Sequence, residues 1–501
     1  MKGTIFRRLR RTRVPVLAVV ALMAAMLLAA RPAHATTYTV NSTDDVGDQS
    51  PGNGICDTEP FQVGTRPKCT LRAAIEDANA ATGADTVTVP AGAYTLTRAN
   101  GNGGDASTGD LNVTGELTIT GAGARATRVV GVGGELPFDD RIFSIQPTAT
   151  ATITGLTITG GKPPFDQGGG VLNRGDLTLA RVAVRGNTAT FEAGGIYSAA
   201  TTFNRPTLNI IDSTVSGNSV ASEIGVVGGI EQDGGIANIT NSTISGNRAA
   251  TFGGGVAANE GAHIFIRNST IASNTSGRQG GGIEAFANTS VLMHNTIVAG
   301  NSVDDCEDAQ SAAGIFSQGN NISSDDSCHF SKSTDKRNTN PLLGPLQDNG
   351  GPTDTRALLG GSPAIDRGAA SIAGSDFGCP ATDQRGVSRP QGPRCDIGAF
   401  ERPNGRPVAR NDSYRGVEDR TLFVRGRGVL GNDTDPDRDA LRATLVSRPG
   451  KGKLTLRPGG AFTYKPKKNF SGTVRFVYRA SDGRGGTDTA TVSVRIRARP
   501  G

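Results

Sequence analysis

Four carboxylates occupy alternate positions of one short stretch near the C-terminal end of the sequence. They stand in the run GVLGNDTDPDRD, which is rich in turn-forming residues. Acidic side chains in such a loop can converge on a hard cation, and calcium accepts carboxylate oxygens. The run lacks the Gly and Glu of an EF-hand, so the two hypotheses are another kind of calcium site and a solvated loop. The four residues are Asp433, Asp435, Asp437 and Asp439.

Two glutamates would share one outward column if the middle of the chain forms stacked coils. With the coils aligned on a Gly-Gly-aliphatic mark, Glu231 and Glu284 lie two coils apart with Ala257 between them, and Glu260 is close by. Two coils span about 9.6 Å, near the separation of the carboxylates of inverting glycoside hydrolases. The column therefore supports, as the alternative function, a polysaccharide-degrading lyase or inverting hydrolase. Neither the motifs of polygalacturonases nor an arginine base beside an acid cluster accompanies it, so a non-enzymatic protein is the favoured hypothesis.

Other residues that commonly carry chemistry are sparse. The four His are scattered and no CxxC occurs, so no zinc site is expected, and His263 and His294 are expected on the surface. The sequence has no phosphate-binding loop and no aromatic–basic pattern for nucleic acids. We expect no required cofactor, calcium as the one candidate ion, and no nucleic-acid partner.

The element that would position the glutamates is an internal repeat of 27 to 31 residues. Heptapeptides such as DSTVSGN and NSTISGN recur and each closes on Asn. Self-similarity at this period indicates a solenoid. Stacked Asn side chains can form a hydrogen-bonded ladder, and Asn tolerates the left-handed conformation that tight turns need. The closing residues are Asn187, Asn218, Asn247, Asn274 and Asn301.

Each repeat also contains a Gly-Gly-aliphatic mark and an alternating apolar pair. Pairs such as Leu177/Leu179 and Ile264/Ile266 have the period of two expected of a strand with one buried face. Glycine at this second turn is expected to supply positive φ. About three short strands per repeat predict a right-handed parallel β-helix over residues 85–335.

The N-terminal end of a solenoid needs a cover, because its apolar core would otherwise face water. The run TLRAAIEDANAA predicts a helix over residues 70–81 that ends before Gly83, with Leu71 and Ile75 on its apolar face. We expect this helix to be the cap, within an N-terminal region of residues 36–84.

The six cysteines form three local pairs in the sequence. An even number of cysteines in an exported chain favours disulfides, and each local pairing would close a loop without periodicity. The expected bridges are Cys56–Cys69, Cys306–Cys328 and Cys379–Cys395.

Residues 1–35 have the pattern of a signal peptide: a basic start, an apolar run over residues 14–30, and Ala33-His34-Ala35 as a cleavage site. We expect cleavage after Ala35 and no membrane span afterwards. The alternative is an uncleaved anchor, for which the run is short.

The leader also accounts for most of the basic character of the chain. It holds seven of the 52 Lys and Arg residues, and the other 45 nearly balance the 46 Asp and Glu residues. The remaining charge is unevenly placed: residues 36–405 carry net −13 and residues 406–501 carry net +12. Either the two parts complement each other, or the basic part contacts an anionic polymer of the cell envelope.

Three segments resemble known families of exported bacterial proteins. CTLRAAIEDAN resembles the N-terminal CSLREA motif, and the GG-aliphatic and SGN repeats resemble right-handed parallel β-helix repeat proteins. GSPAIDRG, CPATDQRG and CDIGAFE, within residues 336–402, resemble the choice-of-anchor Q segment. GVLGNDTDPDRD and the strands after it, within residues 406–501, resemble the cadherin-like or Ig-like domains of adhesins.

The sequence thus predicts an all-β fold: a right-handed parallel β-helix with a short N-terminal capping helix, and a small C-terminal Ig-like β-sandwich. The resemblances imply a secreted or cell-surface protein. We expect it to bind a glycan or a surface protein, as adhesins do, and not to catalyse a reaction.

Overall fold

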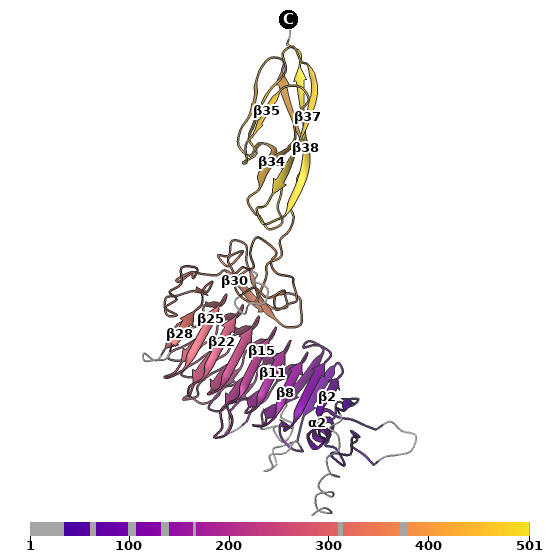
Figure 1. The fold of residues 1–501 in the computed structure, drawn as a ribbon, viewed down its shortest axis with the longest axis vertical. Coiled ribbons are helices and arrows are strands. Elements are labelled where there is room, and N and C mark those ends of the chain that lie inside the picture. Colours follow the sequence, from indigo (N-terminus) through magenta and orange to yellow (C-terminus); the bar gives the residue numbers. More distant parts are fainter. Residues whose placement is uncertain are drawn as a thin grey trace, which may run out of the picture.

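The computed structural model describes residues 35–60, 67–98, 107–131, 140–163, 167–308, 314–370 and 378–499. All of the expected leader except Ala35 lies outside these residues. A long β-solenoid is followed by a separate β-domain at the C-terminal end (Figure 1). Within the described ranges, no helix combines the length and the apolar character needed to cross a bilayer.

Three parallel sheets form the walls of the solenoid, and each full coil passes through sheet C, sheet A and sheet B in turn. Sheet A consists, in spatial order, of β1 (Thr37–Thr39), β2 (Ala84–Val89), β5 (Glu116–Gly121), β8 (Thr150–Thr154), β11 (Asp176–Ala180), β15 (Thr207–Ile211), β19 (Ile236–Thr240), β22 (His263–Arg267), β25 (Ser290–His294) and β28 (Gly314–Ser317). Sheet B consists of β3 (Gly92–Leu96), β6 (Thr127–Gly131), β9 (Thr157–Thr159), β12 (Ala183–Arg185), β16 (Thr214–Ser216), β20 (Thr243–Ser245), β23 (Thr270–Ala272), β26 (Ile297–Ala299) and β29 (Ile322–Ser323). Sheet C consists of β4 (Leu111–Val113), β7 (Phe143–Ile145), β10 (Val171–Asn173), β14 (Ile196–Ala199), β18 (Ile230–Asp233), β21 (Val256–Asn259), β24 (Ile283–Ala285) and β27 (Cys306–Asp308). Short pairs lie outside these walls: β13 (Thr188–Ala189) with β17 (Ser219–Val220), and β30 (Leu343–Gln347) with β31 (Thr355–Leu358).

The inside of the solenoid is filled by the aliphatic residues that the alternating pattern selects. Leu177 and Leu179 are fully buried, and so are Ile264 and Ile266 three coils later. Side chains of this size fit between walls that repeat at the spacing of parallel strands. The predicted all-β solenoid is confirmed.

The closing asparagines lie directly over one another and are buried. Each side-chain Nδ2 donates to the Oδ1 of the next Asn along the stack, at 3.0, 2.9, 2.9 and 3.0 Å from Asn187 to Asn301. The last amide, that of Asn301, donates to Asp305 Oδ1 at 2.9 Å. Each Nδ2 also donates to a backbone carbonyl; for Asn247 this is Val215 O at 3.0 Å. In these side chains both Nδ2 protons are donated, and both lone pairs of Oδ1 accept a hydrogen bond inside a dry core.

The turns differ from the prediction in one respect. The left-handed residue is the one before the closing Asn, as in Gly246 with φ of 70°, and not the Asn itself. The Gly-Gly marks are also not the left-handed residues; they are needed because neighbouring coils touch there. A Cβ at Gly229 would lie 2.3 Å from the carbonyl oxygen of Gly255, which no side chain tolerates.

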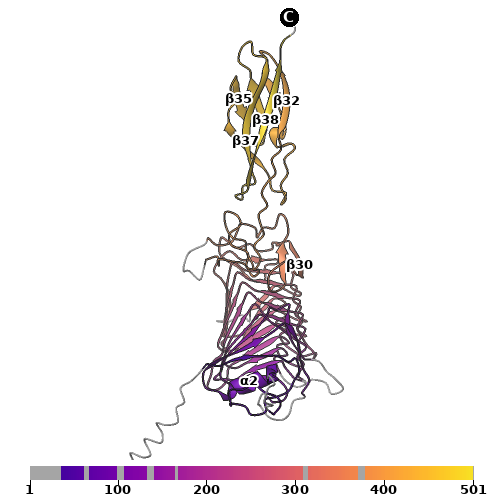
Figure 2. The ribbon, with the colours of Figure 1, turned by 90° about the vertical axis from the view of Figure 1, so that its right-hand side faces the viewer.

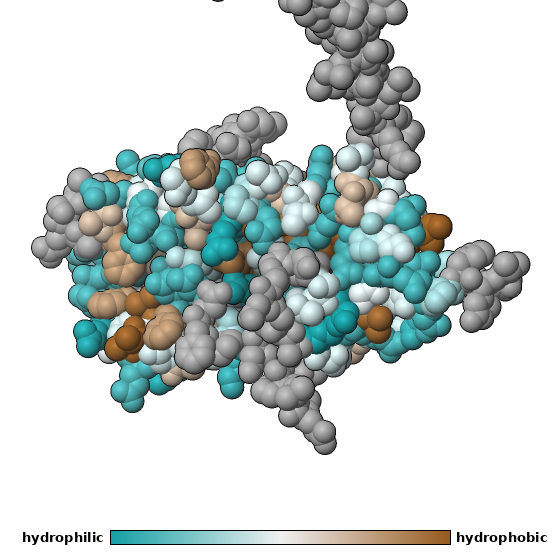
Figure 3. All heavy atoms as spheres, turned by 90° about the horizontal axis from the view of Figure 1, so that it is seen from below, coloured by the Kyte–Doolittle hydropathy of each residue, from teal (hydrophilic) through white to brown (hydrophobic). Residues whose placement is uncertain are grey.

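The capping helix is α2 (Leu71–Ala80), close to the predicted range. Thr70 is its N-cap and accepts from the Ala73 N–H at 3.1 Å, and the helix ends three residues before Gly83. Figure 2 shows α2 at the end of the solenoid away from the C-terminal domain. The helix is buried on more than its apolar face, because a preceding loop covers it: Arg72 and Asp45 form a buried ion pair at 2.6 Å. Seen from below, the described surface is mainly hydrophilic, with hydrophobic residues in small separate groups (Figure 3).

All three expected disulfides are present. They are Cys56–Cys69 beside the cap, Cys306–Cys328 at the last coils, and Cys379–Cys395 in the segment that follows the solenoid.

The segment after the solenoid folds back along the outer face of sheet B. Thr243 Oγ1 donates to Gln384 Oε1 at 2.6 Å, and the Ala399 N–H donates to Thr270 Oγ1 at 3.1 Å. Arg356 of β31 reaches Ser245 at 2.8 Å. This segment, which belongs to the expected range 336–402, therefore covers one wall of the solenoid.

The C-terminal domain is a two-sheet β-sandwich. One sheet contains, in order, β32 (Asp412–Val417), β38 (Thr487–Arg497), β37 (Gly472–Ser481) and β34 (Arg442–Ser447), and the other contains β33 (Leu422–Val424), β36 (Phe462–Lys465) and β35 (Lys453–Leu456); the 3₁₀ turn η1 (Gly428–Leu430) precedes β34. Phe476 and Tyr478 of β37 pack inside it with Val492 and Val494 of β38, as the alternation predicts. The predicted Ig-like domain is confirmed.

The Asn ladder gives a stability prediction. Asn247→Ala removes a buried donor and acceptor, and it leaves the backbone N–H and one Nδ2 proton of Asn218 without an acceptor. We expect a loss of roughly 2–4 kcal/mol in the free energy of unfolding, because each unsatisfied buried polar group costs about 1–3 kcal/mol. Urea unfolding followed by circular dichroism measures this loss.

The matched control is Asn238→Ala in β19. Its amide donates to Asn209 at 3.0 Å on the partly exposed outer side of sheet A. Water can replace that bond, so the control should change stability by less than about 1 kcal/mol. Equal effects of the two substitutions would contradict the structural role of the buried ladder.

Candidate functional site

The predicted glutamate column exists in sheet C. Glu231 of β18 pairs in register with Ala257 of β21, which pairs with Glu284 of β24. The column continues to Glu307 of β27 on one side and to Tyr197 of β14 on the other. The two predicted carboxylates are thus two coils apart, as the alignment of the repeats requires.

Both glutamates are buried, although they point away from the aliphatic core. Glu231 is 1% exposed and Glu284 is 3% exposed. The turn before each strand folds over the column: a Cβ at Gly253 would lie 3.0 Å from the Cβ of Ala257, and one at Gly280 would meet the carboxylate of Glu284. This close cover needs left-handed residues, and both glycines have positive φ.

The electrostatics of the column raise the pKa of its carboxyl groups. Burial raises the pKa of Glu284 to about 8, helped by the nearby negative charges of Glu307, Asp304 and Asp308. Burial also raises the pKa of Glu231 well above its ordinary value, and the charged neighbours that add to this rise are again carboxylates. One oxygen of each side chain, Oε2, has no hydrogen-bond partner among the described residues. These are unusual surroundings for two acids, because a buried charge normally has a partner.

Three further residues belong to this region and were not predicted. Tyr197 OH donates to Asp233 Oδ2 at 2.8 Å, and Glu192 lies near both of them. Burial and the acidic neighbours raise the pKa of all three groups. Tyr197 was detectable, since it follows the Gly-Gly mark of its repeat at the position of Glu231.

The remaining predicted residues lie elsewhere. Glu260 is exposed in the turn after β21, where it lines a surface cavity of about 520 Å³ together with residues 200–205. His263 is exposed, as expected, but His294 is only 5% exposed, so its predicted surface position is wrong. It ends β25 next to the turn that carries Asn295.

Three of the four alternating aspartates come together. Asp435, Asp437 and Asp439 can each bring one oxygen to within 4.8 Å of the others. They also face cations of the protein: Asp437 pairs with Arg402 at 3.0 Å, and Asp439 lies 3.4 Å from Arg484. Calcium here would compete with these two arginines.

Asp433 does not belong to this group. It is 5% exposed and accepts hydrogen bonds from Tyr478 OH, at 2.9 and 2.8 Å, and from the Arg410 N–H at 2.8 Å. Its carboxylate therefore ties the loop after η1 to β37 and to the backbone at Arg410.

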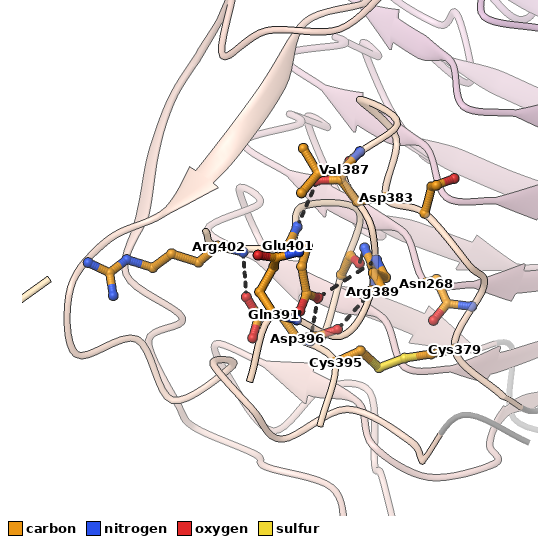
Figure 4. Close-up of polar contacts among 12 residues, drawn as sticks. Asn268, Cys379, Asp383, Val387, Arg389, Gln391, Cys395, Asp396, Glu401 and Arg402 are labelled. Atoms are coloured by element: carbon orange, nitrogen blue, oxygen red, sulfur yellow. Dashed lines mark hydrogen bonds and ion pairs between the residues drawn. A yellow bond between two sulfur atoms is a disulfide. The ribbon is translucent and has the colours of Figure 1, made fainter. Parts of the chain in front are cut away.

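A second buried charged cluster lies in the segment that covers sheet B (Figure 4). Arg389 donates to the carbonyls of Asp396 and Gly398 and lies 3.8 Å from Glu401. Asp383 accepts from the Glu401 N–H at 2.9 Å and pairs with Arg385 at 2.6 Å.

The carboxyl groups of this cluster act on the backbone of their own segment. Glu401 accepts from the N–H groups of Asp396 and Gln391, both at 2.8 Å, and Asp396 accepts from the Arg402 N–H at 2.6 Å. Burial raises the pKa of Asp396 to about 7, with the charge of Glu401 adding to it. These groups fix the shape of a segment that has little regular structure, so we assign them no chemistry.

Comparisons with known proteins match only part of the chain. The family model of the bacterial Ig domain matches residues 404–495. Among solved structures, an endo-fucoidan hydrolase, MfFcnA4 from glycoside hydrolase family 107, is 19% identical with a TM-score of 0.16; the match covers 20% of this chain and 15% of that enzyme. A likeness this weak supports no functional argument. No curated protein matches the chain.

The buried Glu284 gives a prediction for pH dependence. Its folded pKa of about 8 lies above its ordinary value of 4.5. The stability that the protonated group contributes is therefore complete below pH 4.5 and is lost as the pH rises through 8. Glu284→Gln should match the wild type at pH 4 and be more stable at pH 9, by on the order of 2–4 kcal/mol.

Melting temperatures measured from pH 4 to pH 9 test this prediction. Glu116→Gln, at an exposed position of β5, is the control and should leave the pH profile unchanged. A Glu284→Gln profile parallel to that of the wild type would contradict the protonated state of this carboxyl group.

Proposed function

We propose that the protein acts outside the cytoplasm, secreted or at the cell surface of a bacterium, and binds a glycan or a surface protein through its β-helix. The observation that carries this proposal is the bacterial Ig domain at residues 404–495, attached to a disulfide-bonded solenoid. Disulfides persist in oxidising compartments, and Ig-type sandwiches commonly serve as spacers in cell-surface proteins. Cleavage of a signal peptide after Ala35 is part of the proposal.

A binding function agrees better with the glutamate column than catalysis does. A glycosidase needs one protonated and one ionised carboxyl group in contact with the sugar. Glu231 and Glu284 are almost entirely buried, and burial raises the pKa of both groups. A reaction at this column would require the cover of these carboxyl groups to open.

The resemblance of residues 336–402 to the choice-of-anchor Q segment agrees with a role in attaching the Ig-like domain to the β-helix. Asp366 of this segment pairs with Arg484 of the Ig-like domain at 2.8 Å, so the basic domain meets the acidic body through at least one ion pair. We propose that the segment mounts the domain on the β-helix. The domain's net charge of +12 leaves many further cations that could contact an anionic envelope polymer.

Binding and catalysis are separated by one set of assays on the full chain. We expect retention on one class of a glycan array, without release of reducing ends or of unsaturated products from acidic and neutral polysaccharides. Fractionation of the source cells should recover the mature chain from the medium or the envelope. Catalytic activity that disappears in Glu231→Gln, and persists in the exposed control Glu116→Gln, would replace this proposal by the enzymatic alternative.

Calcium binding at Asp435, Asp437 and Asp439 is a separate proposal. If the turn binds calcium, the melting temperature of the Ig-like domain within the full chain should rise in millimolar calcium. At a tenfold excess over Kd the gain is about 1.4 kcal/mol. Asp435→Asn should remove the gain, and Asp419→Asn, in another turn of the domain, should keep it. A melting temperature that does not depend on calcium would refute the site.

A further inference from the structure

The three walls of the solenoid differ in what covers their outer faces. The described residues of the segment 341–401 lie along sheet B. The glutamate column of sheet C is covered by the turns that precede the strands of sheet C. Sheet A presents its row of parallel strands on one side of the molecule (Figure 1). In the N-terminal half of sheet A, the outward side chains form hydrogen bonds only with residues of neighbouring coils, as far as the described residues show.

Two of the outward columns of five neighbouring strands of sheet A are almost all threonine, whereas the outward column before them reads Ala84, Glu116, Thr150 and Asp176. The strands carry the pattern Thr-aliphatic or aromatic-Thr, with the middle residue buried in the core and the two threonines outside. Strand register places the threonines in two straight columns, and only the last position of the second column differs, with Ala180. The first column is Thr37, Thr86, Thr118, Thr152 and Thr178, and the second is Thr39, Thr88, Thr120 and Thr154.

The columns form a flat lattice with fixed dimensions. Neighbouring strands are about 4.8 Å apart, and the two threonines of one strand are about 6.7 Å apart. The buried residues between them, such as Val87 and Ile119, are fully enclosed and hold the strands in place. Thr is stiff at χ1, so each hydroxyl and methyl group keeps one orientation. We name these nine residues the threonine lattice.

The nine threonines carry no charge, and two exposed acids, Glu116 and Asp176, border them two residues before Thr118 and Thr178. No side-chain hydrogen bond to another described residue engages Thr86, Thr118 or Thr152. At the edge of the lattice, Thr178 Oγ1 accepts from Asn209 at 3.3 Å and Thr154 Oγ1 accepts from Arg181 at 3.4 Å. Each free hydroxyl can donate one hydrogen bond and accept two.

The fold does not require threonine at these positions. The first column continues through later coils with Asn209, Asn238, Phe265, Leu292 and Phe316, and the second continues with Ile211, Thr240, Arg267 and His294. Those coils keep the buried asparagines and the Gly-Gly marks, so coil geometry alone does not select the lattice. The full Thr-x-Thr pattern is confined to β1, β2, β5 and β8 among the described strands of sheet A, which agrees with selection for a surface contact.

The chemistry of the lattice limits what it can bind. Nucleic acids and acidic polymers need cations, and protein partners are usually held by aromatic and Arg anchors in pockets. A rigid array of identical neutral groups is complementary to a ligand that is itself neutral and periodic in two directions. Ordered water at the surface of ice has these properties: it accepts and donates hydrogen bonds at regular intervals, and the methyl groups favour ordered water between the hydroxyls.

We propose that the threonine lattice binds ice. Each contact is weak, but the strands are already in place, so binding orders few side chains, and the contributions of nine residues add. The proposal is independent of the glycan or protein partner proposed above, since that partner could use any other face.

The test is the growth of ice in solutions of the full chain. We expect the wild type to slow ice recrystallisation, to shape single ice crystals, and to enter growing ice. Thr118→Tyr and Thr152→Tyr each place a ring above the flat lattice and should lower the recrystallisation activity by roughly tenfold or more. Tyr is favourable at an outward strand position, so the variants should fold, which unchanged melting temperatures would verify.

The matched control is Asn238→Tyr, in the same outward column of sheet A but two coils beyond Thr178, the last threonine of that column. It should keep full activity. A second pair, Thr118→Val and Thr118→Ser, removes the hydroxyl or the methyl group without a change of shape, and both should weaken activity. Wild-type protein without effect on ice, lattice variants as active as the wild type, or retention on powdered chitin or cellulose without any effect on ice would each overturn the proposal.

Discussion

The stacking of each coil on its neighbour is the constraint on which the rest of the structure depends. At one corner, buried asparagine amides bond to one another along the stack. At another corner, the Gly-Gly marks let backbones approach more closely than any side chain allows. If one coil shifted by one residue, its Asn amide would miss its partner and leave buried donors unpaired. The ladder therefore fixes the register of each coil on the next. Insertions between the marks, which vary the repeat from 27 to 31 residues, must then bulge outward.

Because the register of the coils is fixed, the spacing of residues in the sequence determines where they lie on the surface. A residue type that recurs at one position of the repeat becomes a straight column on the outside. On sheet C the column of Tyr197, Glu231, Glu284 and Glu307 gathers acidic groups, whereas on sheet A the equivalent regularity gathers neutral threonines. Sheet B has Thr243 and Thr270 at outward positions, and these hold the segment that returns over them. The same backbone thus presents three chemically different walls.

Features that depend on local order were predictable, and features that depend on distant segments were not. The asparagine ladder, the three local disulfides and the strands of the Ig-like domain follow from repeats and alternation within short stretches. The cover of sheet B is formed by contacts such as that of Gln384 with Ser213, which are 171 residues apart, and no periodicity signals them. The burial of Glu231 was missed because it depends on how the turn before the strand folds over the column. Asp433 was grouped with its neighbours by spacing, whereas Tyr478, from the middle of β37, withdraws it into the sandwich.

The walls also differ in how they respond to the solution. Glu231 and Glu284 of sheet C are buried, and the charged described residues that shift their pKa are all carboxylates, so their free energy depends strongly on proton concentration and little on salt, which does not penetrate. The Ig-like domain carries a large positive charge on exposed side chains, so its attraction to acidic surfaces weakens as salt screens it. The threonines of sheet A have no ionisable group, and contacts made through them depend on neither variable. Salt and pH therefore distinguish which surface a partner occupies: an interaction that both variables leave unchanged belongs to the threonine lattice.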